Sequence, residues 1–261
     1  MYNQWIAVAL ISTLSISALA ATQEEQRVKQ AGNAIRFVLD LPRTIPKSLL
    51  DQAACVVVFP AGPGNSLWGP SSSETASDRS TSGPGQSVPS PGNILSRGNT
   101  IHAFGVMTCR TDDFRGNWGA PVMMELEGRT PTVKIQIDNL LLLLMNRRIA
   151  SNILSNKMEL GGPGDGSEGA GLIQDRGTPI KVSLLHPVDV LTYGSAGNAL
   201  APRVSVSTDS LVRDDGANKK LYGKKVSTKE IVLKGAVPAP DAASELIEAL
   251  NKVSPKSMSN D

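Results

Sequence analysis

The sequence predicts an α+β fold: an antiparallel sheet, or a barrel-like core, covered by helices from the two ends of the chain. Of the 261 residues, 40% are hydrophobic but only 4% are aromatic. Glycine and proline are frequent, with 24 and 17 residues, which favours many strands and turns over a helical bundle. Helical periodicity is clearest near the two ends, whereas most strand-like segments begin in mid-chain.

The charge pattern argues against a nucleic-acid partner. The chain carries 26 basic and 24 acidic residues, a formal net charge of +2 at pH 7. Recognition of nucleic acid needs a concentrated basic face, whereas the Lys and Arg residues here are scattered among nearly as many carboxylates.

Residues 1–20 have the features of a secretory signal peptide. The apolar run Trp5–Ala20 ends in small residues, with Ala18 and Ala20 spaced as in an A-x-A cleavage site. The run is short for a bilayer and diluted by Ser and Thr, which disfavours an uncleaved membrane anchor. The absence of Lys or Arg before it counts against cleavage. We expect an exported protein, periplasmic or extracellular, that can associate peripherally with a membrane.

An amphipathic helix is predicted over Glu24–Leu39. Its apolar residues Val28, Ala31, Ile35 and Val38 recur at helical spacing. Such a stripe can pack on the protein core or lie in the headgroup boundary of a membrane. Periodicity alone favours the core.

Two prolines separate this helix from the first predicted strand. Pro42 and Pro46 end the helix and introduce a short second helix over Ser48–Ala54, because proline is tolerated in a first turn but not inside a helix. The apolar run Cys55–Phe59 then predicts a buried strand.

A Ser/Gly/Pro-rich segment at about 62–98 interrupts what is otherwise predicted to be one domain over 21–261. It has too few apolar residues to offset the entropy of ordering it, so we predict a disordered insert. Trp68 is the one residue in it suited to dock onto a partner.

Most predicted strands follow the insert. Ile101–Arg110 and Ala120–Leu126 are predicted to form a hairpin around the turn-like sequence TDDFRGNWG. Alternation over Val133–Ile137 and the apolar run Leu140–Met145 indicate a strand that enters the core, although that run can instead line a lipid cavity. Further strands are predicted at Lys181–Tyr193, Arg203–Ser207 and Lys229–Leu233.

Two later helices are predicted, over Arg147–Ser155 and Asp241–Val253. Asp241 is suited to the N-cap of the second. Its apolar stripe consists of Leu246, Ile247, Leu250 and Val253.

Cys55 and Cys109 are the two cysteines of the chain. In an oxidising compartment they can pair and close a loop around the insert. Equally, both can be buried thiols that pack as small hydrophobic side chains. The sequence leaves both alternatives open.

No catalytic, metal or cofactor site is expected. The two histidines, His102 and His186, lack a motif context, which favours structural roles. Nucleophile-elbow, zinc and Walker motifs are absent, although a carboxylate pair can converge from anywhere in a fold. Gly161–Gly171, with Asp165 and Glu168, is suited to an anion or Ca²⁺, but its composition favours a plain connection.

Seven basic residues are candidates for contact with acidic lipid headgroups, because anionic membranes attract Lys and Arg. Three lie on the first helix and four form the densest basic cluster of the chain, for which a solvated loop is the alternative. They are Arg27, Lys29, Arg36, Lys219, Lys220, Lys224 and Lys225.

Six stretches, in order along most of the mature chain, resemble the SYLF domain, a lipid-binding family. No single stretch is diagnostic, but their order is unlike a chance match. They are IPKSLLDQAACVVVFP (45–60), FRGNWGAPVMMELEG (114–128), IQIDNLLLLLMN (135–146), KMELGG (157–162), TYGSAGN (192–198) and ANKKLYG (217–223).

The chain also departs from the family's pattern. The long insert replaces a glycine-rich segment, Gly119 replaces the usual serine after Trp118, and Ile137 replaces a usual glycine. Where those glycines shape a ligand surface, binding would be altered.

The resemblance implies a non-enzymatic domain that binds membrane phospholipids, with acidic headgroups as the expected class and the first helix as an interfacial element. An envelope protein captured by the insert is the alternative partner. An enzyme with a carboxylate site is the third alternative.

Overall fold

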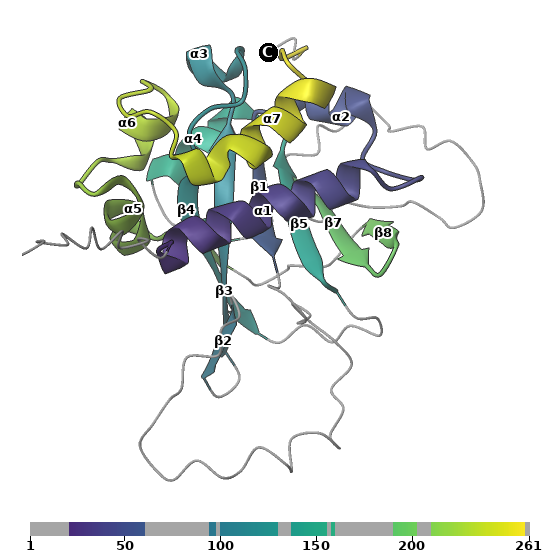
Figure 1. The fold of residues 1–261 in the computed structure, drawn as a ribbon, viewed down its shortest axis with the longest axis horizontal. Helices are drawn as coiled ribbons and strands as arrows, with labels where there is room; N and C mark the ends of the chain where they lie inside the picture. Colours follow the sequence, from purple (N-terminus) through teal and green to yellow (C-terminus); the bar gives the residue numbers. More distant parts are fainter. Residues whose placement is uncertain are drawn as a thin grey trace, which may run out of the picture.

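In the computed structural model, the described strands form one antiparallel sheet with helices on both faces (Figure 1). The structure describes residues 21–60, 94–97, 100–129, 137–155, 158–159, 190–202 and 210–258. The predicted signal peptide, most of the predicted insert, the glycine-rich segment 161–171, His186 and the predicted strands at 133–136 and 203–207 lie outside the described residues.

The sheet confirms the predicted α+β class. Its strands run in the order β6-β9-β4-β3-β1-β5-β7-β8, with β2 also paired to β3, and each pair is antiparallel. The bounds are β1 Cys55–Pro60, β2 Ile94–Arg97, β3 Thr100–Cys109, β4 Val122–Arg129, β5 Asn139–Leu144, β6 Met158–Glu159, β7 Val190–Ala196, β8 Ala199–Pro202 and β9 Ser210–Arg213.

Strand β1 is buried on both faces, as its continuous apolar sequence predicts. It lies between β3 and β5, and all of its residues are buried. Val57 belongs to the core cluster on one face of the sheet, whereas its neighbours Val56 and Val58 belong to the cluster on the other face. Successive strand side chains point to opposite faces, so a strand covered on both sides needs apolar residues throughout.

The first and last described helices cover the same face of the sheet. Helix α1 (Gln23–Leu39) packs against α7 (Ser244–Val253), and Figure 1 shows the two running across the strands. Helices α2 (Lys47–Gln52) and α5 (Asp215–Tyr222) contribute to the core cluster on this face. Helices α4 (Arg147–Ser155) and α6 (Thr228–Val232) contribute to the cluster on the opposite face.

The apolar run 140–145 belongs to the packed core on both faces of the sheet. Leu140, Leu142 and Leu144 belong to the α4 side of the sheet, and Leu141 and Leu143 to the α1 side. All five side chains are completely buried. The alternation of strand side chains therefore divides this leucine run between two packed layers.

Two predicted elements near the C-terminus are corrected by the structure. The predicted strand Lys229–Leu233 is wrong: the segment is helix α6, which begins at a capping box where Ser227 and Glu230 bond each other's backbone N–H. Asp241 does not cap α7, because Asp241–Ala243 form a 3₁₀ turn, η3, and α7 begins at Ser244.

The insert ends earlier than predicted. Residues 94–97 form β2, which pairs with the start of β3, from Ile94↔Ala103 to Arg97↔Thr100. Strand β1 pairs with the later part of β3, up to Cys55↔Cys109, and β4 occupies the other edge. Strands β1 and β2 therefore pair with the same edge of β3.

The turn between β3 and β4 contains the single helical turn α3 (Thr111–Phe114). Its residues Asp112, Asp113 and Phe114 have positive φ angles of 50°, 54° and 64°. Side chains other than glycine are disfavoured in this left-handed region. Burial of the Phe114 side chain offsets that cost by placing an aromatic ring in the core.

Candidate functional site

The apolar stripe of α1 is part of the protein core. Val28, Ala31, Ile35 and Val38 are completely buried, in the cluster shared with α7 and the sheet. A helix that inserts this stripe between lipid headgroups would have to leave the sheet first. The prediction that this stripe contacts lipid headgroups is thus wrong. The structure supports the alternative, in which the helix packs on the core.

Arg27 also lies inside the protein, although it was predicted to meet lipid headgroups. Its residue is only 8% exposed, and its guanidinium lies 4.5 Å from the ring centroid of Phe104. Burial lowers the pKa of Arg27, and the carboxylates of Glu24, Asp214 and Glu125 oppose that shift. Arg27 therefore fixes α1 to β3 rather than serving as a surface contact.

The outer face of α1 carries the other two predicted basic residues. Lys29 is exposed, and the Arg36 side chain is 63% exposed, with Nη1 2.6 Å from Glu245 Oε1 of α7. Phe37 lies beside Arg36 and is 39% exposed, one of two large hydrophobic residues exposed in the described part of the chain. Its position off the apolar stripe was a signal in the sequence for an outward-facing aromatic ring.

The lysine cluster is divided between helix α5 and the connection that follows it. Asp214 caps α5 by accepting a hydrogen bond from Ala217 N at 2.8 Å, and Gly223 ends the helix at φ 66°. Lys219 and Lys220 occupy the last turn, where cations interact favourably with the helix dipole. Lys224 and Lys225 follow, and all four lysines are exposed.

The structure brings the two predicted basic groups together. Lys220 Nζ lies 3.3 Å from Glu24 Oε1, at the first turn of α1, and Figure 1 shows α5 beside that end of α1. Two segments almost two hundred residues apart in sequence thus lie side by side at this end of α1. We call their exposed residues, together with those further along α1, the α1–α5 surface: Lys29, Arg36, Phe37, Lys219, Lys220, Lys224 and Lys225.

A second feature, the Arg110 hub, joins the C-terminal tail to the sheet. The Arg110 side chain is completely buried, and each of its five N–H donors has an acceptor. Nε donates to Ala53 O (3.1 Å), Nη1 to Gly116 O and Ser254 O (both 3.2 Å), and Nη2 to Leu50 O (3.0 Å) and Ser254 Oγ (2.6 Å).

Stacking and charge complete this hub. The guanidinium carbon of Arg110 lies 4.3 Å from the Trp118 ring centroid, and Trp118 Nε1 donates to Ser254 O at 2.9 Å. Burial lowers the pKa of Arg110 to about 10, with the charge of Asp51 opposing the shift. Arg110 therefore stays protonated at neutral pH. A cation enclosed by backbone carbonyls in this way is structural rather than a ligand site.

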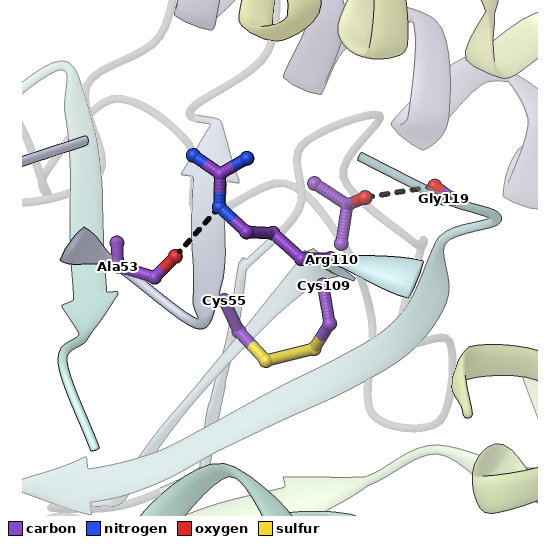
Figure 2. Close-up of a disulfide and its surroundings, with 6 residues drawn as sticks. Ala53, Cys55, Cys109, Arg110 and Gly119 are labelled. Carbon is purple, nitrogen blue, oxygen red and sulfur yellow. Dashed lines mark hydrogen bonds between the residues drawn. A yellow bond between two sulfur atoms is a disulfide. The ribbon is translucent and has the colours of Figure 1, made fainter. Parts of the chain in front are cut away.

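The two cysteines form a disulfide beside this hub (Figure 2). Cys55 and Cys109 are directly opposite each other on β1 and β3, and Cys109 precedes Arg110. Of the two alternatives that the sequence left open, the structure contains the bridge.

Three ionisable side chains meet at the far end of the β3–β4 pair. His102 Nδ1 lies 2.6 Å from Glu125 Oε1, and Glu127 completes a group whose potential ligand atoms lie within 4.8 Å of one another. The sequence favoured a structural role for His102 because the residue has no motif context; its carboxylate neighbours come from another strand.

The described helices include none with the length and apolar content needed to cross a membrane.

Comparison with known proteins identifies one family. Residues 132–253 match the model of Ysc84, described as Las17-binding protein actin regulator, the family of the SYLF domain. No curated protein and no solved structure matches the chain. The matched range includes four of the six stretches that resemble the family, whereas 45–60 and 114–128 precede it. Over residues 132–253 the chain is therefore similar to the SYLF domain family.

Proposed function

We propose that this protein is a non-enzymatic lipid-binding protein, and that it contacts acidic phospholipid headgroups through the α1–α5 surface. The family is associated with lipid and actin-related binding. The observation that favours this surface is that α5, which carries the exposed Lys219 and Lys220, contacts the first turn of α1. Lys29 and the ring of Phe37 are exposed further along α1. Export to the periplasm or the extracellular space, with peripheral membrane attachment, is part of the same proposal.

The physical basis is electrostatic attraction supplemented by one apolar contact. A basic residue near an anionic membrane contributes about 1 kcal/mol, so several lysines together give reversible binding. Arg36 contributes less, because Glu245 already neutralises part of its charge. Phe37 can enter the headgroup region without any change in the core, since its ring is already outside the packed stripe.

Co-sedimentation with phosphatidylcholine vesicles containing increasing phosphatidylglycerol tests this proposal. We expect binding that grows with anionic lipid and falls at high salt, because exposed charges are screened. The double variant K29E/K219E should bind at least about ten-fold more weakly, since it reverses two charges that face the membrane. Phe37→Ser should weaken the binding that persists in salt.

The matched control is K229E/K234E, which makes the same charge change at two exposed lysines on α6 and in the segment after it, on the opposite face of the sheet. It should bind as the wild type does. Equal losses in both double variants would show that net charge, and not the α1–α5 surface, governs binding; no binding to any vesicle would contradict the proposal as a whole.

Protein binding is the second candidate function. The matched family is described as Las17-binding and as regulating actin, and the matched range contains α5 and α7. Co-sedimentation with actin filaments in lipid-free buffer separates the two candidates. Filament binding that K29E/K219E leaves unchanged would favour a protein partner over a membrane.

A further inference from the structure

His102, Glu125 and Glu127 share one face of the sheet. His102 is directly opposite Glu127 in the β3–β4 register, and Glu125 is opposite Phe104. Residues two apart on a strand point the same way, so the group lies on the same face as Val106 and Met123, the face that α1 covers. It is thus separate from the outer face of α1 and from the Arg110 hub.

The three side chains are close enough to share one small cation. One ligand atom from each lies within 4.8 Å of the others, and the 2.6 Å contact between His102 Nδ1 and Glu125 Oε1 is a hydrogen bond that the ion would replace. The His102 and Glu125 side chains are 25% and 21% exposed. They are therefore shielded enough to strengthen a charge interaction, yet open enough for an ion to enter.

The backbone holds these positions firmly. Strands β3 and β4 pair without interruption from Thr100↔Arg129 to Met107↔Val122. A site whose residues stand on paired strands keeps its geometry better than one on loops. Only side-chain rotation is then needed to bring three ligand atoms around one ion.

The local charge favours a cation. Arg27 lies over Phe104 and interacts with Glu24, Asp214 and Glu125, and Lys220 pairs with Glu24. Glu125 and Glu127 place two carboxylates beside the His102 ring. A divalent ion would interact favourably with both carboxylates.

We propose that His102, Glu125 and Glu127 form a binding site for a divalent transition-metal ion of the Zn²⁺ type. An imidazole nitrogen with two carboxylate oxygens is a donor set that suits Zn²⁺, whereas Mg²⁺ and Ca²⁺ prefer oxygen ligands alone. Three protein ligands leave a coordination position for water. The proposal does not depend on lipid binding.

Calorimetric titration of the chelator-treated and dialysed whole chain with Zn²⁺ tests the site. We expect about one equivalent to bind, and His102→Gln and Glu127→Gln each to weaken binding at least about ten-fold, since each removes a ligand. Mg²⁺ should give no comparable binding. The matched controls are His186→Gln, the other histidine of the sequence, and Glu248→Gln, an exposed acid on α7; both should bind Zn²⁺ as the wild type does.

Imidazole NMR of the wild type keeps the test independent of how the variants fold. The chain has two histidines, so Zn²⁺ should shift the ring nitrogen resonances of one, assigned to His102 by their loss in His102→Gln. Wild-type protein that binds no Zn²⁺, or a His102→Gln protein that binds it with wild-type affinity, would overturn the proposal. So would a Zn²⁺-dependent shift confined to His186.

Discussion

The guanidinium of Arg110 joins three parts of the chain that are distant in sequence. Its acceptors lie at the end of α2, in the turn after α3 and in the C-terminal tail. Asp51 supports the same arrangement, because its Oδ1 accepts a hydrogen bond from Ser254 Oγ at 2.6 Å. A single buried cation therefore stabilises the attachment of the segment after α7 to α2 and to the turn after α3.

Replacing Arg110 with lysine is expected to lower the free energy of unfolding by about 2–4 kcal/mol, because an ammonium group has three donors, lacks the planar fork and leaves buried carbonyls without partners. Urea unfolding measures this change. Arg115→Lys, at an exposed position in the next turn, is the control and should change stability by less than about 0.5 kcal/mol. Equal stabilities of the two variants would show that the Arg110 hub contributes nothing specific.

Among the helices and strands, hydrophobic periodicity predicted those that are buried either on one side or on all sides. Helix α1 and strand β1 were predicted within a residue or two because their apolar spacing records which sides are covered. Helices α5 and α6 carry weaker patterns, but their capping residues, Asp214 with Gly223 and Ser227 with Glu230, were readable signals.

The candidate sites were less predictable because they depend on contacts between elements. Arg27 is buried by Phe104 from another strand, and nothing in the helix sequence distinguishes it from exposed Lys29. The group at His102 depends on the β3–β4 register, and a shift of one residue would turn its members to opposite faces. Neither the Arg27–Phe104 contact nor the β3–β4 register can be inferred from the spacing of residues within one helix or strand.

Gly32 permits the close approach of α1 and α7. A Cβ atom there would lie 2.9 Å from the Leu246 backbone nitrogen, so Gly32→Ala should force the helices apart and destabilise the protein by about 1–3 kcal/mol, despite the higher helix propensity of alanine. Thermal unfolding measures the effect. Gly216→Ala on α5 is the control: its nearest neighbour would be 3.4 Å away, and it should be neutral or stabilising. A neutral Gly32→Ala would indicate that the helix pair adjusts freely.

For the whole molecule, the residues matched by the family are structurally inseparable from those before them. Strand β5 pairs with β1, β9 pairs with β4, and α7 packs on α1. In each case one partner lies within residues 132–253 and the other precedes them. The sheet is therefore completed by the N-terminal half of the chain.

The Cys55–Cys109 bridge is expected to stabilise this sheet substantially. It joins residues separated by 54 positions, for which the loss of entropy in the unfolded chain corresponds to about 4 kcal/mol. The variant C55A/C109A should lose stability of this order in urea unfolding. Dithiothreitol should lower the midpoint of the wild type and leave that of the variant unchanged; a wild-type midpoint insensitive to reduction would contradict the expectation.

The same bridge makes the fold tolerant of changes in the chain length between Pro60 and Ile94. Without a crosslink, a longer connection makes folding costlier, by about 0.6 kcal/mol for each doubling. Here the Cys55–Cys109 disulfide closes the loop in the unfolded chain as well as in the folded one. Most of the entropy cost of a longer loop is therefore present in both states and cancels from the free energy of folding. Insertions, deletions or even a whole inserted domain in this interval would therefore change the free energy of folding of the sheet very little. Selection can then vary the length of this segment independently of the sheet.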